Sequence, residues 1–260
     1  MKKIPFYLLL FLCIAFLSQS TIFAQSSTYL NLGMNLPQGN FGSKADNSIL
    51  FGPDEHLKIS DYGGANTGIN VGFKFVNRTK AEGLGFMFTV DGLFNKLQNN
   101  LKSEDFVPYY VPEIHGIPIS VKNPKYFNLP IMAGLNYGMN LNRVLGFFVE
   151  AGAGINTRFI TPCKITAFDY TLEHKPDYTY TIRYTTKFSF AYQFGAGLII
   201  KNAIYFGVSY FDLGDALVEG KTEKLLKTTA FEPVVGEKEN FKYRQLSTRM
   251  LVLRLGIRLG

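Results

Sequence analysis

The residues best suited to catalysis or metal binding are three histidines, His56, His115 and His174, in a chain of 260 residues. They lie far apart, and none has a second His, Cys, Asp or Glu at the spacing that a metal site uses. The sequence therefore predicts no metal site and no cofactor. Each histidine is expected to be a solvated loop residue.

A nucleophilic site would need a hydroxyl or thiol beside a base and a carboxylate. The nearest approach to that set is a single segment that contains Ser43, Asp46, His56 and Asp61. Their spacing does not single out a triad, so the sequence predicts no catalytic residue, although an enzyme that modifies membrane lipids stays open as an alternative.

A second group of charged residues lies inside segments of alternating polarity, always on the polar side of the alternation. Buried charges have to pair, because an unpaired ion is costly to desolvate. We expect an internal ion-pair network in which Arg254 and Arg258 meet Glu150 or Asp91. Its expected role is structural, filling the interior and fixing strand register, and a proton or ion pathway is the alternative. The network is predicted to contain Lys74, Asp91, Glu150, Arg158, Arg254 and Arg258.

The segments that carry these charges alternate between apolar and polar residues, with a period of two. In one segment Val71, Phe73 and Phe75 alternate with Asn70, Gly72 and Lys74. Such alternation indicates β-strands, whose successive side chains point to opposite faces. Eight strands are predicted, near residues 28–36, 66–77, 83–96, 126–140, 145–159, 187–200, 204–214 and 246–260.

The connections between these strands alternate strictly between short and long. Three are tight turns rich in Asn, at residues 77–80, 140–143 and 201–203. The other four each run to roughly thirty residues, the asymmetry expected of short periplasmic turns and long extracellular loops. The predicted fold is all-β: an eight-stranded antiparallel up-and-down transmembrane β-barrel, with four long extracellular loops and three short periplasmic turns.

The composition of the two strand faces predicts which one meets lipid. One face carries Gly and Asn, for example Gly152, Gly154 and Asn156, and the other carries Phe, Leu, Ile, Val and Tyr. Small and amide side chains suit the crowded interior of an eight-stranded barrel, so the apolar face is expected outside, in the bacterial outer membrane. A soluble lipocalin-like periplasmic carrier, with the apolar face inside, is the alternative.

The N-terminus and the composition indicate the cell compartment to which the chain is sent. Residues 1–24 combine Lys2 and Lys3 with an apolar stretch and small residues, which predicts a secretory signal peptide followed by a barrel domain over residues 25–260. Only Cys163 remains after that segment, so no internal disulfide is expected. The net charge of +7 is spread along the chain without a nucleic-acid motif.

Two stretches of the second half resemble the PorT-like outer-membrane β-barrel family. Residues 125–159 carry a strand with Leu129-Pro130-Ile131, a short turn, and a strand ending in Gly152-Ala153-Gly154; residues 194–214 resemble the family's next hairpin. The resemblance implies the fold and an outer-membrane location, and one such protein is linked to secretion. The chain departs from the usual barrel pattern by ending in Gly260 instead of an aromatic residue.

The expected function is that of a non-enzymatic integral outer-membrane protein that acts in binding or envelope organisation. Long loops on a rigid scaffold are where binding usually resides. The expected partners are outer-membrane lipid and lipopolysaccharide, with a protein or surface ligand at the loops and no nucleic acid.

Overall fold

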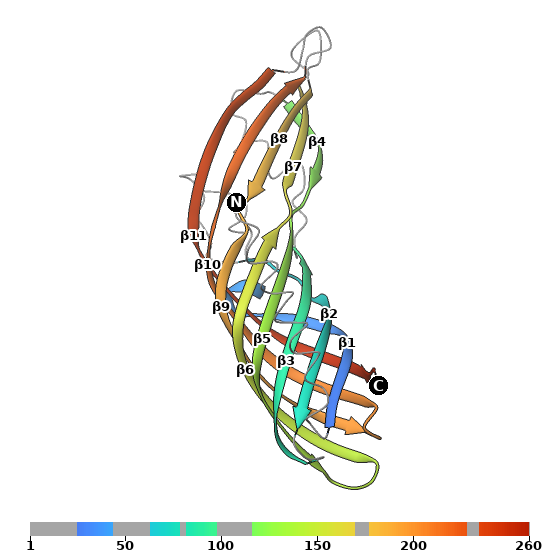
Figure 1. The fold of residues 1–260 in the computed structure, drawn as a ribbon. Helices are drawn as coiled ribbons and strands as arrows, with labels where there is room; N and C mark the ends of the chain where they lie inside the picture. Colours follow the sequence, from blue (N-terminus) through green and yellow to red (C-terminus); the bar gives the residue numbers. More distant parts are fainter. Residues whose placement is uncertain are drawn as a thin grey trace.

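The computed structural model describes residues 25–43, 63–78, 82–97, 116–169, 177–227 and 234–259. Eleven antiparallel strands in these ranges form one sheet, shown in Figure 1. They are β1 (Gln25–Gln38), β2 (Gly68–Arg78), β3 (Gly83–Lys96), β4 (Gly116–Lys122), β5 (Lys125–Asn140), β6 (Leu145–Ile160), β7 (Cys163–Asp169), β8 (Asp177–Tyr184), β9 (Lys187–Ile200), β10 (Ile204–Lys227) and β11 (Val234–Arg258).

Eight of these strands close into a ring in the order β1-β2-β3-β5-β6-β9-β10-β11. The ring closes where β11 pairs antiparallel with β1, for example Leu255 with Leu32. Closure leaves no unpaired strand edge around the ring, which a sheet in lipid requires. The predicted eight-stranded antiparallel barrel is confirmed, and its strand boundaries agree within a few residues except at the outer ends of β10 and β11.

Tight hairpins join the strands at one end of the ring, here called the turn end. Between β9 and β10, Lys201 and Asn202 both have positive φ (49° and 52°), and the N–H of Ala203 donates to the carbonyl of Ile200 at 3.0 Å. These are the features of a type I′ turn, whose twist matches that of paired strands. Between β5 and β6, the Asn142 side chain accepts hydrogen bonds from the N–H groups of Val144 and Leu145, each at 2.8 Å.

The first predicted turn needs a correction. Arg78 was expected in the turn at residues 77–80, but it is the last residue of β2 and pairs with Gly85 of β3. The β2–β3 ladder continues to Arg78, one residue beyond the predicted strand. The side chain of Arg78 points into the lumen, where it bonds to Asn136.

The sheet continues beyond the ring at its opposite end, here called the loop end (Figure 1). Strands β10 and β11 continue past the ring and stay paired as far as Leu226 with Val234. Strand β8 adds to β10, β7 adds to β8, and β4 adds to β7. The outer parts of β10 and β11 together with β8, β7 and β4 form a five-stranded distal sheet. The described part of the long connection after residue 214 is therefore paired strand, and β4, β7 and β8 were not predicted.

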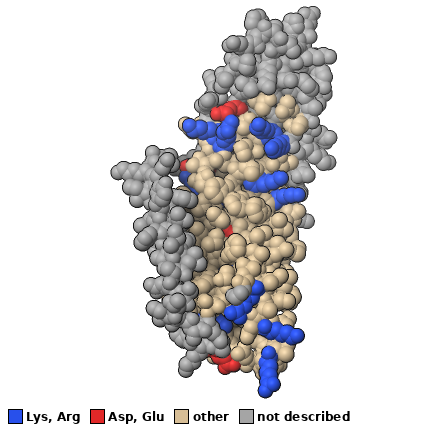
Figure 2. Space-filling model, turned by 45° about the vertical axis from the view of Figure 1, so that its right-hand side comes forward, with Lys and Arg blue, Asp and Glu red and all other residues tan. Residues whose placement is uncertain are grey.

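The wall and the lumen of the ring carry opposite kinds of side chain. Phe188 and Phe190 of β9 are 71% and 68% exposed, whereas Asn31, Asn128 and Asn156 are fully buried. Figure 2 shows that Lys and Arg lie toward the two ends of the wall on the face in view, with an almost uncharged band between them. The apolar set therefore faces outward, which confirms the predicted assignment and excludes the lipocalin-like arrangement.

A short helical turn, α2 (Gly39–Gly42), closes the loop end of the lumen. Phe41 of α2 is fully buried, and its ring packs edge to face on Tyr126, with centroids 5.0 Å apart. The Tyr126 hydroxyl donates to the carbonyl of Gly63 at 2.7 Å, and the N–H of Ala65 donates to the carbonyl of Phe41 at 2.8 Å. In the described ranges, no helix is long and apolar enough to cross a membrane.

Candidate functional site: the polar lumen

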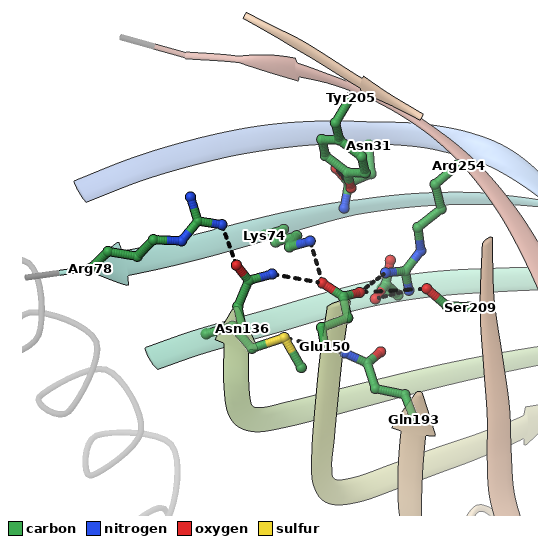
Figure 3. Close-up of polar contacts among 11 residues, drawn as sticks. Asn31, Lys74, Arg78, Asn136, Glu150, Gln193, Tyr205, Ser209 and Arg254 are labelled. Carbon is green, nitrogen blue, oxygen red and sulfur yellow. Dashed lines mark hydrogen bonds and ion pairs between the residues drawn. The ribbon is translucent and has the colours of Figure 1, made fainter. Parts of the chain in front are cut away.

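Four of the six predicted lumen charges meet at the middle of the barrel. Glu150 of β6 forms an ion pair with Lys74 of β2, and its second oxygen lies 3.9 Å from Arg254 Nη1. Arg254 Nη2 of β11 donates to Asp91 Oδ2 of β3 at 2.8 Å. Figure 3 shows Glu150 between Lys74 and Arg254, which come from separate strands of the ring. All four side chains are at most 3% exposed.

Neutral side chains complete the coordination of Glu150. Asn136 Nδ2 donates to Glu150 Oε2 at 3.3 Å, and the Ser209 hydroxyl lies 3.5 Å from Glu150 Oε1. Asn136 also accepts a hydrogen bond from Arg78, which extends the network to the turn end (Figure 3). A buried carboxylate is stable only when its oxygens are satisfied in this way.

Aromatic rings lie against both cations of the network. Lys74 Nζ is 4.1 Å from the ring centroid of Phe148 and 4.8 Å from that of Tyr205. The guanidinium carbon of Arg254 is 4.7 Å from the centroid of Phe211. Cation–π contacts of this length are favourable and strengthen when the cation is desolvated.

Apolar clusters lie on either side of the charged network along the barrel axis. At the turn end the cluster contains Tyr29, Val76, Met87, Phe148, Ile199 and Tyr205. At the loop end a larger cluster runs from α2 down to β5 and β11; its members include Phe41, Leu93, Tyr126, Met132, Phe211, Leu246, Met250 and Val252. The network is therefore enclosed between two apolar layers, an arrangement that fills an eight-stranded lumen with side chains.

Arg158 lies in the lumen but bonds to backbone carbonyls and a hydroxyl instead of carboxylates. Its Nη1 donates to the carbonyl of Leu246 at 3.1 Å, and its Nη2 donates to the carbonyl of Gly214 at 3.3 Å and to the hydroxyl of Thr248. The β10–β11 register shifts between Asp212 and Asp215, where Gly214 has a φ of 73°. A bulge leaves carbonyls without ladder partners. Arg158 satisfies such carbonyls at the point where the distal sheet begins.

Arg258 also lies apart from the other predicted charges. It is half-buried at the turn end, and its Nη2 donates to the carbonyl of Ser26 at 3.4 Å. The four central residues are thus brought together, whereas Arg158 and Arg258 make separate contacts at opposite ends of the lumen.

Several residues of the network were not singled out from the sequence. Asn136, Tyr205 and Ser209 are neutral, so the rule that buried charges must pair did not select them. The Gly and Asn face of the strands already placed Asn136 inward, and the inward position of Tyr205 and Ser209 could have been read from the same alternation, because each stands between outward-facing neighbours in its strand. Which inward residues touch across the lumen depends on the stagger of the strands, which alternation does not reveal.

The candidate catalytic and metal-binding residues give no assembled site in the described ranges. His56, His115 and His174 lie outside those ranges, as do Asp46 and Asp61. Ser43 is described, and its hydroxyl donates to the carbonyl of Gly39 at 2.9 Å. Among the described residues, no group of three or more His, Cys, Asp or Glu side chains is arranged to hold a metal ion.

The geometry defines a class of protein. A closed ring with an apolar wall, a polar sealed lumen and turns at one end is an integral β-barrel of the outer-membrane type, since only such a barrel satisfies its backbone in lipid and exposes an apolar exterior. The outer-membrane location predicted from the sequence follows from the same features.

Solved structures of similar fold are outer-membrane proteins. One is Ail, the attachment invasion locus protein of Yersinia pestis, in complex with the heparin analogue sucrose octasulfate; it is 11% identical, with 90% of this chain and 97% of that chain covered and a TM-score of 0.39. Another is a major outer membrane protein from Thermus thermophilus, which is 8% identical. The match covers 90% of this chain and 99% of that chain, with a TM-score of 0.42. No protein-family model matches the chain, and no curated protein matches it either.

Proposed function

We propose that this protein is a non-enzymatic outer-membrane barrel whose distal sheet is a binding or organising surface outside the membrane. The barrel supplies a rigid anchor, and the distal sheet supplies the surface. Partners of this surface are a protein or another surface ligand, while the wall meets outer-membrane lipid and lipopolysaccharide. The resemblance to PorT-like proteins supports a role in envelope organisation or secretion.

The observation that carries this proposal is the continuity of β10 and β11 through the ring and into the distal sheet. β10 is 24 residues long and β11 is 25, so both extend well beyond the length of about ten residues that a tilted spanning strand needs. Arg158 ties the bulge between the two parts to β6. The distal sheet is therefore joined to the barrel by paired strands instead of a free linker.

The orientation and export of the chain belong to the same proposal. Residues 1–24 act as the signal peptide, and residues 25–260 form the barrel domain. The short turns face the periplasm, and the loop end faces the cell exterior. In outer-membrane barrels short turns are periplasmic, which supports this direction.

The sealed lumen supports a structural role over a transport role. Charged pairs at its centre lie between two apolar clusters, so ions would have to displace packed side chains to pass. The four central charges are proposed to fill the barrel and fix its register.

A truncation in the native host tests the proposed function. Residues 220–241 are replaced by Asn-Gly, because Glu219 and Lys242 are paired across the hairpin and a two-residue turn can join them. The matched control is Arg143→Gln/Lys201→Gln, which changes two exposed cations at the turn end and leaves the distal sheet and the lumen network intact. Both variants are expressed in a deletion strain, and envelope integrity and protein secretion are compared.

We expect the truncated barrel to reach the outer membrane and fail to restore the deletion strain, and Arg143→Gln/Lys201→Gln to restore it. Full restoration by the truncated barrel would contradict the proposal. The lipid A and phospholipid composition should stay unchanged in the deletion strain; an altered lipid would favour the enzyme alternative.

A further inference from the structure

Two pairs of lysines lie on neighbouring strands where the loop end of the barrel wall meets the distal sheet. Lys96 of β3 is the register partner of Lys125 of β5, and Lys122 of β4 is the register partner of Lys164 of β7. All four side chains are exposed. Like charges directly opposite each other destabilise a sheet. An anionic partner would offset this repulsion at both pairs.

The lysines point away from the lumen. Lys96 and Lys125 alternate with the buried Asn95 and Tyr126, which face inward. Lys164 follows Cys163, which is fully buried in the loop-end apolar cluster. The two pairs are therefore on the outer side of the sheet.

Neither pair is neutralised within the described part of the protein. The ion pairs among the described residues involve other lysines and arginines, namely Lys74, Arg183, Lys187, Arg249 and Arg254. By contrast, Arg249, an exposed cation of β11 on the opposite side of the ring, is paired with Asp212 at 3.0 Å. As far as the described residues go, the four lysines have no acidic partner and can pair with an anion from outside.

An aromatic ladder lies directly below the first lysine pair. Phe94, Phe127 and Phe159 are stacked across β3, β5 and β6, with ring centroids 4.6 and 5.6 Å apart. Phe94 and Phe127 each lie two residues from a lysine of the pair, a rise of about 7 Å along the strand. The ladder crosses three strands, so it offers a flat apolar surface about 10 Å wide.

We propose that the lysine pairs and the phenylalanine ladder bind the phosphorylated, multi-acylated glycolipid of the outer leaflet, lipid A of lipopolysaccharide. The ladder contacts acyl chains, and the lysines above it contact phosphate groups. A soluble anion would use the lysines and leave the ladder unused, whereas a lipid uses both at the observed spacing. This inference rests on the proposed function, because it requires the loop end to lie in the outer leaflet.

Native mass spectrometry of the full chain, refolded in a non-ionic detergent, tests this site. The probes are bisphosphorylated lipid A, the same lipid with its phosphates removed, and phosphatidylglycerol. The test variant is Lys96→Gln/Lys125→Gln. The charge-matched control is Arg143→Gln/Lys201→Gln, which removes two exposed cations from the turn end. Lys96→Arg/Lys125→Arg keeps the charge and serves as the conservative variant.

We expect the Gln variant to bind phosphorylated lipid A about tenfold more weakly or worse, because each lysine near an anionic head group adds several-fold to affinity. The turn-end control and the Arg variant should stay within about twofold of the native protein. Dephosphorylated lipid A and phosphatidylglycerol should bind the native protein more weakly than lipid A does.

Equal loss in the turn-end control, an unchanged Gln variant, or equal binding of the dephosphorylated lipid would overturn the site. Each protein is first checked for the gel shift on heating that a closed barrel gives. A barrel that shifts on heating but shows no lipid selectivity overturns the lipid A site alone. A protein that shows no shift overturns both the site and the proposed function.

Discussion

Arg254 and Asp91 are 163 residues apart in the sequence, yet Arg254 Nη2 lies 2.8 Å from Asp91 Oδ2. The strands that carry them, β11 and β3, are separated in the ring by β1 and β2. This ion pair therefore crosses the lumen and forms only when the ring is closed. Closure of the barrel and pairing of these two buried charges therefore depend on each other.

Replacing Arg254 with Met should destabilise the barrel strongly. The substitution leaves Asp91 buried without its cation, and breaking a buried pair in this way typically removes about 3–5 kcal/mol of stability. The measurement is urea unfolding of the protein refolded in lipid vesicles, followed by the gel shift. The double variant Asp91→Asn/Arg254→Met should recover part of the loss, because it removes both charges. A single variant as stable as the native barrel would contradict a structural role for the pair.

The lumen should stay closed to ions in both the native protein and Arg254→Met. The two apolar clusters lie on either side of the network and do not depend on the guanidinium. Planar bilayer recordings of the refolded proteins should show no regular conductance steps. Stable steps in Arg254→Met, absent from the native protein, would mean that the network itself seals the barrel. Steps in both proteins would favour the ion-pathway alternative.

Gly256 and Tyr205 form a size-matched pair in the lumen. They are register partners on β11 and β10, and a Cβ added to Gly256 would lie 2.0 Å from Tyr205 Cε1. Gly256→Val should lower the stability by about 1–3 kcal/mol, since overpacking displaces the ring. Unfolding of Gly256→Val, Tyr205→Ala and the double variant measures the coupling. The double variant should be more stable than the sum of the single losses predicts; strict additivity would show that the ring does not pack on Gly256.

Cys163 should react very slowly with thiol reagents in the folded protein. It is fully buried at the start of β7, and burial raises the pKa of its thiol to about 12, from an ordinary value of 9.0. At neutral pH this lowers the reactive thiolate fraction about a thousandfold. Maleimide labelling of folded and urea-unfolded protein measures the difference. Rapid labelling of the folded protein would show that the loop-end cluster is open around β7.

The strands of the ring were predictable because their side chains alternate and their turns carry Asn. For example, residues 83–96 were assigned as a strand, and β3 has those bounds. The inward position of Lys74, Asp91, Glu150 and Arg254 followed from the same alternation. All four are buried in the structure.

The distal sheet was not predictable by the same argument. β7 and β8 are only seven and eight residues long, and they pair outside the ring, where neither face is required to be apolar. The contacts of Arg158 were also hidden, because they depend on a bulge at Gly214. The alternation along a strand shows which side chains point inward. Which residues they contact depends on bulges and on the stagger of the strands around the barrel.

Fractionation of the native host, combined with a gel run with and without heating, tests whether the apolar wall faces lipid. The structure predicts that the protein will be in the outer-membrane fraction, will need detergent for extraction, and will migrate faster before heating than after it. A protein found in the soluble fraction, with the same mobility in both lanes, would contradict the closed barrel with an apolar exterior.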